Sequence, residues 1–311
     1  MKKILCMLLA LTMILALCAC GETAAPSASE APAQSAAPAE ESAAPAGADY
    51  SAMSLDELKA EISTVVDGKL TVATSPDFAP YEFYAIDDNG DPQLAGFDLA
   101  LAQYIADFLG LELEIIPIDF DGVLNELAAG SVDLGMAGLS PDPTRMDAMD
   151  FSDIYYQGGQ SFVTVKGSED KFPTLADANK PEYSIGAQNG SIQMDLANEN
   201  TPDADIVSLV KVTDIVAELL GGKLDGAFIE TVVAESYAQS YPELVIALDV
   251  PCDVAGSAVG VMKGNAALLA GVNMAIAAAI EDGSMDQFVV EANELANGKT
   301  ASLVDGEIVE D

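Results

Sequence analysis

The chain has 311 residues, half of them apolar, and carries 51 acidic side chains against 12 basic ones. This length and apolar content suffice for the core of a two-part protein, whereas a net charge of −39 makes nucleic acid and anionic membrane surfaces poor partners. Because the chain has no histidine, a Ser-His-Asp or Cys-His catalytic machine is excluded, and we expect no metal site and no cofactor.

The N-terminus has the layout of an export signal. Met1-Lys2-Lys3 is followed by an apolar run from Ile4 to Leu17, which is too short to span a membrane. Residues 1–19 are therefore predicted to be a signal peptide. Residues 20–50 consist mainly of Ala, Pro, Ser, Glu and Gly, which cannot bury enough apolar surface to order themselves, so they predict a disordered linker.

The segment Leu17-Cys18-Ala19-Cys20 resembles a bacterial lipobox. The resemblance implies cleavage before Cys20 and attachment of lipid to its sulfur; a plain secretory signal cut after Ala19 is the alternative. No later apolar stretch is long and uncharged enough to span a bilayer. We therefore expect the rest of the chain at the outer face of the cytoplasmic membrane, anchored only by its lipid, with Cys252 as a buried lone thiol.

The body of the chain alternates strand and helix signals. Ser54 and Glu57 have the spacing of a helix-capping box. The first alternation predicts strands at 69–74, 113–116 and 132–137, a hairpin around 87–91, and helices at 97–108 and 123–129. The second predicts strands at 161–165, 183–187, 206–209, 226–229 and 244–248, with helices at 192–199, 213–220 and 232–241. A strand at 257–263 and an Ala-rich helix at 266–281 follow.

This alternation predicts an α/β protein with parallel strands, helices on both faces of each sheet, and a ligand at the carboxyl ends of the strands. Two such units in one exported chain indicate two lobes with a cleft between them.

Arg145 is the only arginine in the chain and follows a short run rich in Gly, Ser and Thr. A guanidinium is a planar fork of donors that matches a carboxylate in bidentate fashion, so a lone arginine there indicates capture of a ligand carboxylate. The alternative is a structural ion pair with Asp147 or Asp150.

Several motifs along the chain occur in an order that is typical of one family. They lie in segments 73–83, 96–98, 124–156, 186–191 and 260–263, and include Gly96-Phe97-Asp98 and Asp150-Phe151-Ser152-Asp153. With these motifs, residues 69–296 resemble family 3 solute-binding proteins, the polar amino-acid class that serves ABC importers.

The resemblance implies a two-lobed periplasmic-binding-protein-like fold of type II. Its first lobe would comprise residues 51–161 and, after the chain returns, 259–298; the second lobe would comprise 162–258, and 299–311 would be a tail. Two crossover strands, near Ser161–Val165 and Ala258–Met262, would form the hinge.

The resemblance also assigns roles to residues that would hold the ends of a bound amino acid. Arg145 matches the arginine that clamps the α-carboxylate, and Ser140 matches a residue that helps to hold both ends. Gly138 matches a backbone carbonyl that accepts from the ammonium, and Gly190 and Ser191 match a turn whose N–H groups meet the carboxylate. As alternatives, the two serines cap helices and the glycines only form turns.

Three further positions would contact the ligand, and one bears on its identity. Phe78 and Phe120 match walls over the ligand side chain, with membership of the core as the alternative. Glu230 matches the carboxylate that pairs with the ammonium, although the family most often has Asp there; the alternative is a solvated acid. Ser75 replaces an acidic residue often found in relatives that bind cationic or amide side chains. The resemblance therefore favours a neutral or small polar amino acid.

Together these inferences predict a monomeric, lipid-anchored receptor that is not an enzyme. It would bind a free amino acid between its lobes and deliver it to the permease subunits of an ABC importer. The alternatives are an exported dehydratase-like enzyme of the same fold, with Glu230 as acid and base, and a receptor for carboxylic acids.

Overall fold

The computed structural model describes residues 50–253, 256–298, 300–304 and 307–310. The predicted signal peptide, Cys20 and nearly all of the predicted linker lie outside the described residues.

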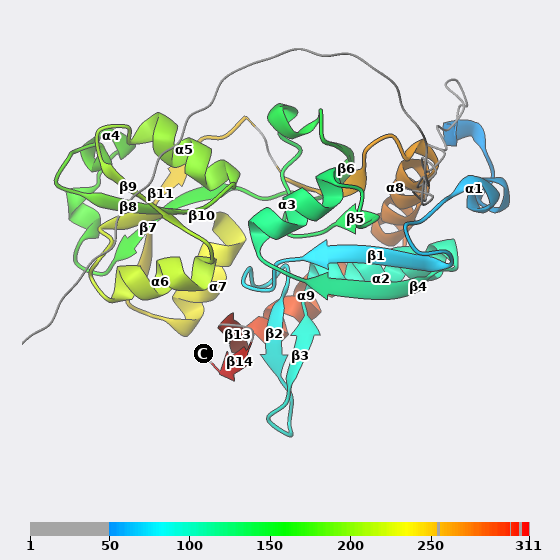
Figure 1. Ribbon diagram of the computed structural model, residues 1–311. Coiled ribbons are helices and arrows are strands. Elements are labelled where there is room, and N and C mark those ends of the chain that lie inside the picture. Colours follow the sequence, from blue (N-terminus) through cyan, green and yellow to red (C-terminus); the bar gives the residue numbers. More distant parts are fainter. Residues whose placement is uncertain (1–49, 254–255, 299, 305–306, 311) are drawn as a thin grey trace, which may run out of the picture. The chain divides into compact units, whose positions relative to one another are not determined.

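The first lobe is built on a five-stranded sheet with strand order β4-β1-β5-β12-β6 (Figure 1). Its strands are β1 (Lys69–Thr74), β4 (Glu112–Pro117), β5 (Leu134–Gly135), β6 (Met149–Tyr156) and β12 (Ser257–Met262). β1 pairs in parallel with β4 and β5, but β12 pairs antiparallel with β5 and β6. The sheet is therefore mixed. The expectation of parallel strands is wrong for β12 alone, because β6, antiparallel to β12, runs in the same direction as β1, β4 and β5.

Helices cover both faces of this sheet. Successive side chains of β1 point to opposite faces, and those from Leu70 to Thr74 are all buried, so both faces need a cover. Val72 packs with α2 (Phe97–Leu109) and α8 (Ala266–Glu281), whereas the next residue, Ala73, packs with α3 (Phe120–Ala128). Because successive side chains of a strand point to opposite faces, α3 lies on the other side of the sheet from α2 and α8.

The second lobe repeats this plan with strand order β11-β7-β10-β8-β9. Its strands are β7 (Gln160–Val165), β8 (Ser184–Gln188), β9 (Asp205–Leu209), β10 (Gly226–Glu230) and β11 (Leu244–Val250). β8 is parallel to β9 and β10, while β7 is antiparallel to β10 and β11. α5 (Ile192–Asn200) packs on one face, and α6 (Val212–Leu220) and α7 (Thr231–Ser240) pack on the other (Figure 1).

The chain crosses between the two sheets directly beside the two predicted crossover strands. Residues 157–159 join β6 to β7, and the segment from Pro251 to Gly256 leads from β11 to β12. Ser161–Val165 and Ala258–Met262 follow these connections and lie within β7 and β12, where ladder hydrogen bonds hold them. Their role as a hinge stays a prediction.

Local sequence signals set several helix boundaries. The capping box is present: Ser54 accepts from the Glu57 N–H, and Glu57 accepts from the Ser54 N–H at 2.9 Å. α2 ends where Gly110 takes a left-handed conformation with φ 75°. The short helices are η1 (Tyr50–Ala52), α1 (Leu55–Glu61), η2 (Pro143–Arg145), η3 (Glu169–Lys171) and α4 (Leu175–Ala178).

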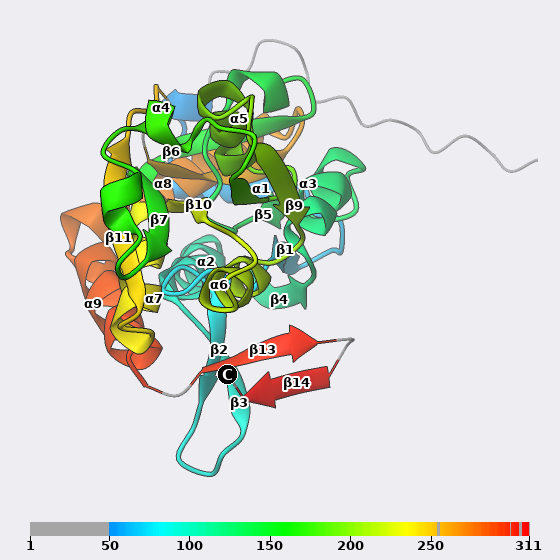
Figure 2. The ribbon, with the colours of Figure 1, turned by 90° about the vertical axis from the view of Figure 1, so that its left-hand side faces the viewer.

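The C-terminal part of the chain adds elements that the pattern did not predict. α9 (Ser284–Ala296) follows α8, and the hairpin of β13 (Thr300–Val304) and β14 (Glu307–Glu310) adds to β2 (Phe83–Ile86) and β3 (Pro92–Ala95) in one sheet (Figure 2). Within the described residues, no single helix has the length and apolar content to cross a membrane; α8 and α9 together do, but they bend by 78°.

Candidate functional site

A cavity lies where the carboxyl ends of strands from both lobes meet. Its lining residues are Phe78, Phe120, Ala137, Gly138, Ser140, Arg145, Gln188, Ile192 and Gln193. The first six of these residues, from Phe78 to Arg145, come after strands β1, β4 and β5 of the first lobe. In the second lobe, Gln188 is the last residue of β8, and Ile192 and Gln193 are the first residues of α5. This is the strand edge at which the α/β pattern predicted a ligand.

Arg145 reaches across this cavity from the first lobe to the second. Its Nη1 donates to the Ser140 carbonyl at 3.3 Å, and its Nη2 donates to the Gly190 carbonyl at 2.9 Å. The guanidinium carbon lies 5.7 Å from the centre of the Phe120 ring. Asp142 holds the preceding turn, because its carboxylate caps η2 through the Thr144 N–H.

Among the described residues, no carboxylate forms an ion pair with Arg145. The alternative of a pair with Asp147 or Asp150 is therefore wrong: Asp150 binds Lys263 instead, with Nζ and Oδ1 2.7 Å apart. The pKa of Arg145 is lowered by burial, but a guanidinium stays charged at any physiological pH. A positive charge held by two neutral carbonyls is suited to an anionic ligand.

Gly138 and Phe78 also line the cavity and lie in close contact with each other. Gly138 has φ 57°, and a Cβ added there would lie 2.6 Å from Phe78 Cε1, so only glycine fits. Its N–H donates to Asp98 Oδ2 at 3.0 Å, and the Tyr155 hydroxyl donates to Asp98 Oδ1 at 2.6 Å. Burial raises the pKa of Asp98 to about 6.

The predicted turn at Gly190 and Ser191 faces the site through its carbonyl. Gly190 has φ 70°, and a Cβ there would overlap Asp121 of the first lobe. The Ser191 hydroxyl donates to the Gln188 carbonyl at 2.7 Å and accepts from the Met194 N–H at 3.3 Å. This is the helix-cap geometry that was the alternative for Ser191, although its N–H role toward a ligand stays a prediction.

Glu230 is buried next to the site but does not line the cavity. It is 4% exposed, so the alternative of a solvated acid is wrong. Its carboxylate accepts from the Val233 N–H at 3.0 Å and from the Gly159 N–H at 3.3 Å, and burial raises its pKa to about 7. Its strand partner Gln160 accepts from Gln193 at 2.8 Å, and Gln193 does line the cavity.

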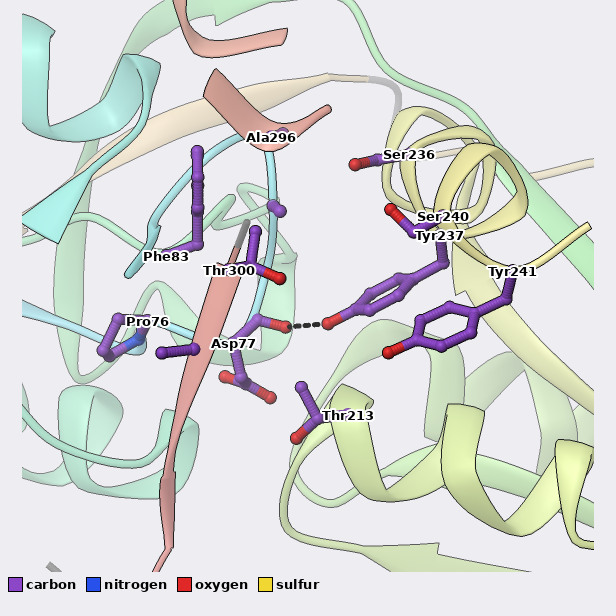
Figure 3. A pocket seen from close by; sticks show the side chains of 12 residues that line it. Pro76, Asp77, Phe83, Thr213, Ser236, Tyr237, Ser240, Tyr241, Ala296 and Thr300 are labelled. Carbon is purple, nitrogen blue, oxygen red and sulfur yellow. Dashed lines mark hydrogen bonds between the residues drawn. The ribbon is translucent and has the colours of Figure 1, made fainter. Parts of the chain in front are cut away.

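Asp77 is a carboxylate near the site that the sequence analysis missed. It accepts from the Ser75 hydroxyl at 2.8 Å within the first lobe, and from the Val212 N–H at 2.6 Å and Gln188 Nε2 at 3.4 Å in the second. Its backbone carbonyl also accepts from the Tyr237 hydroxyl at 3.1 Å (Figure 3). Burial raises the pKa of Asp77 to about 6. One loop residue thus joins both lobes beside the cavity.

Four of the nine lining residues were not predicted, and three of them come from the second lobe. Ile192 and Gln193 were assigned only to a helix, and Gln188 lay just beyond a predicted strand. Their place in the sequence could have indicated them, because the carboxyl end of β8 and the start of α5 lie on either side of the predicted Gly190 turn.

A lone arginine between two α/β lobes, held by backbone carbonyls of both, defines a two-lobed ligand-binding protein. The chain belongs to the bacterial extracellular solute-binding proteins, family 3, because residues 70–291 match that family.

Relatives with known roles are similar over most of the folded body. The arginine-binding extracellular protein of Bacillus subtilis is 33% identical over 199 residues, covering 63% of this chain and 74% of the relative. Cyclohexadienyl dehydratase of Pseudomonas aeruginosa is 26% identical over 195 residues, covering 62% and 71%. The structure of an amino acid ABC transporter substrate-binding protein of Streptococcus pneumoniae bound to L-arginine matches with a TM-score of 0.72 and 31% identity, covering 78% of this chain and 100% of that one.

Proposed function

We propose that this protein is an extracytoplasmic receptor that binds a free amino acid between its lobes and delivers it to an ABC importer. The observation that carries the proposal is Arg145, a cation that forms no ion pair within 4.0 Å with a carboxylate among the described residues and is held in an interlobe cavity by the Ser140 and Gly190 carbonyls. A ligand carboxylate would replace the Gly190 carbonyl, since a charge-assisted bond is stronger than a neutral one.

Contacts across the cavity support a receptor that closes on its ligand. The side chains of Arg145 and Asp77, both in the first lobe, form hydrogen bonds with backbone groups of the second lobe. Arg145 lines the cavity and Asp77 lies beside it. A ligand that touches both lobes binds the closed form more tightly than the open form, so it shifts the population toward closure. The lobe boundaries, at residue 161 and at residue 258, belong to the same proposal.

The amino acid itself is part of the proposal. The replacement of an acid by Ser75 favours a neutral or small polar ligand, whereas the names of several relatives specify arginine. Asp77 lies 2.8 Å from the Ser75 hydroxyl, so a carboxylate is nonetheless present close to that position. Arginine therefore belongs in any test panel beside neutral amino acids.

The same proposal places the protein at the outer face of the cytoplasmic membrane. The lipobox-like segment ending at Cys20 would provide a lipid anchor, and the chain would act as a monomer that presents its closed lobes to the permease. No group in this account undergoes covalent chemistry with the ligand.

A dehydratase acting on a small carboxylic acid is the second candidate. Glu230 favours it, because burial raises the pKa of this carboxyl to about 7 and so leaves it able to give or take a proton near neutral pH. Its position outside the cavity lining counts against direct contact with a ligand. Incubation with candidate acids separates the two functions, since a receptor returns its ligand unchanged.

Calorimetric titration with a panel of free amino acids tests the main proposal. At least one should bind wild type, and Arg145→Ala should weaken that binding by roughly 30-fold to several thousand-fold, corresponding to about 2 to 5 kcal/mol for a desolvated carboxylate. Lys223→Ala is the matched control, because Lys223 pairs with Glu218 and its side chain is 71% exposed. Unchanged affinity in Arg145→Ala would make Arg145 a structural residue.

A further inference from the structure

Glu82 is a buried acid whose backbone is joined to Phe78, a residue that lines the cavity. The Phe78 N–H donates to the Glu82 carbonyl at 3.0 Å, and the Glu82 N–H donates to the Phe78 carbonyl at 3.3 Å. The side chain of Glu82 is 0% exposed, and neither of its carboxyl oxygens has a hydrogen-bond donor in the described part of the chain. An ionised carboxylate in this place would lose its hydration without compensation.

The group in hydrogen-bond contact with the Glu82 carboxyl is a second acid, Asp98 in the first turn of α2. Asp98 is also 0% exposed. Two ionised carboxylates cannot form a hydrogen bond, because both are acceptors only, and two such charges do not share a buried site. One proton must therefore lie between Glu82 and Asp98.

The surroundings of the two acids show which of them holds this proton. Asp98 accepts from the Gly138 N–H at 3.0 Å and from the Tyr155 hydroxyl at 2.6 Å, as an anion requires. Glu82 has no such donors, and the carboxyl of Asp77 lies near it as a further acid. Burial, followed by these two neighbouring acids, raises the pKa of Glu82 well above its usual range. The proton therefore belongs to Glu82, which donates it to Asp98.

Asp98 connects this pair of acids to the ligand cavity. Its Oδ2 fixes the direction of the Gly138 N–H, and Gly138 lies against the Phe78 ring. Both Gly138 and Phe78 line the cavity. Glu82 therefore supports the Gly138–Phe78 contact from two sides, through its backbone at Phe78 and through Asp98 at Gly138.

We propose that Glu82 is a neutral carboxylic acid that donates its proton to Asp98, and that this pair positions the Gly138–Phe78 contact for the ligand. Glu82 does not line the cavity and acts through Asp98, so it is a positioning residue. The positioning role rests on the proposed function, whereas the place of the proton does not depend on any ligand.

Infrared spectroscopy of the ligand-free protein at pH 7 locates the proton. A protonated carboxyl has a C=O stretching band separate from the bands of carboxylates. This band should appear in the difference between wild type and Glu82→Gln, and it should shift when the glutamate carboxyl carbons are isotopically labelled. Glu281→Gln is the matched control, because Glu281 is exposed at the end of α8 and its difference spectrum should lack the band. A Glu82→Gln difference without the band would overturn the assignment and leave Asp98 as the holder of the proton.

Calorimetric titration with the tightest-binding amino acid tests the positioning role. Glu82→Gln keeps an N–H donor toward Asp98 and nearly the same shape, so it should bind almost as tightly as wild type. Glu82→Leu removes the donor and should weaken binding by roughly 2-fold to 30-fold, the range for residues that modulate a site without touching its ligand. Glu281→Leu should leave the affinity unchanged. Should Glu82→Leu not fold, Asp98→Asn tests the same link, since an NH₂ group then replaces one of the two acceptor oxygens and binding should weaken within the same range.

Two results would overturn the positioning role while leaving the receptor proposal intact. One is wild-type affinity in a folded Glu82→Leu or, in its place, Asp98→Asn. The other is an equal loss of affinity in Glu82→Gln and Glu82→Leu, which would show that the donor to Asp98 has no part in binding. If no amino acid binds wild type, the receptor proposal falls and the positioning role falls with it, but the infrared band still shows where the proton lies.

Discussion

Acidification from pH 8 to pH 5 should make the ligand-free protein more stable. Asp77, Asp98 and Glu230 are buried carboxyls whose pKa values are raised, to about 6, about 6 and about 7, chiefly by loss of hydration. A carboxyl with a raised pKa binds its proton more tightly in the folded state than in the unfolded chain. Its contribution to stability is fully present below the unfolded pKa and is lost as the pH rises through the folded pKa.

The magnitude follows from the shifts. Glu230 moves from 4.5 to about 7, and at 1.36 kcal/mol per unit it gains about 2 kcal/mol of unfolding free energy between pH 8 and pH 5. Asp77 and Asp98 begin to take up protons only near pH 6, so each adds about 1 kcal/mol over the same interval. Relief of repulsion within a chain of net charge −39 acts in the same direction.

Denaturant unfolding of the ligand-free protein at pH 8, 6.5 and 5 measures this gain. Glu230→Gln should have a flatter dependence on pH, because its amide cannot titrate. Glu57→Gln is the control, since Glu57 is exposed in the α1 capping box and its pKa is lowered, so its effect falls below this pH range. Loss of stability on acidification, or an unchanged slope in Glu230→Gln, would refute the reasoning.

Two further predictions concern the anchor and the ammonium site. Cys20→Ser should remove the attachment point for lipid, so the mature lipoprotein should disappear from the membrane fraction in metabolic lipid labelling; a normally processed, labelled product would contradict the lipobox, and Cys18 would be tested next. If Glu230 holds the ligand ammonium, Glu230→Gln should weaken binding by roughly 2 kcal/mol, while Glu230→Asp should retain some binding and change the preference among amino acids. In calorimetric competition, wild type should reject the des-amino analogue strongly and Glu230→Gln much less; equal binding of both compounds by wild type would show that no ammonium site exists.

The sequence predicted the elements whose boundaries are marked by local chemistry. α8 has the predicted bounds, Ala266–Glu281, because an Ala-rich run is preceded by Asn265, which caps it, and followed by the left-handed Gly283. α3 begins three residues earlier than predicted, at Phe120, because the Asp119 side chain caps it. This capping carboxylate had not been recognised as a helix start.

Elements that depend on distant partners were harder to predict. Residues 132–137 have a strand-like pattern, but only Leu134–Gly135 form β5. Hydrogen bonds to β1 and β12 set that length, and no local signal encodes them. The β13–β14 hairpin likewise depends on β2, more than 200 residues earlier in the chain.

The candidate site divides in the same way. Arg145 stands out because it is the only arginine, a property of composition that needs no structure. Gln188 gives no such signal, because a glutamine at the end of a strand is ordinary until Asp77 of the other lobe is known to fix its amide. Glu230 stands out in the sequence only against the family's usual Asp, and that it lies outside the cavity lining depends on how β10 pairs with β7.

In the proposed receptor, Arg145 binds the carboxylate of an amino acid between the two lobes. A crystal structure with the tightest-binding amino acid tests it most directly. We expect a bidentate pair between the ligand carboxylate and the Arg145 guanidinium, with the Gly190 carbonyl displaced from its present 2.9 Å contact with Nη2. A guanidinium still bonded to the Ser140 and Gly190 carbonyls, with the ligand carboxylate held elsewhere, would contradict it.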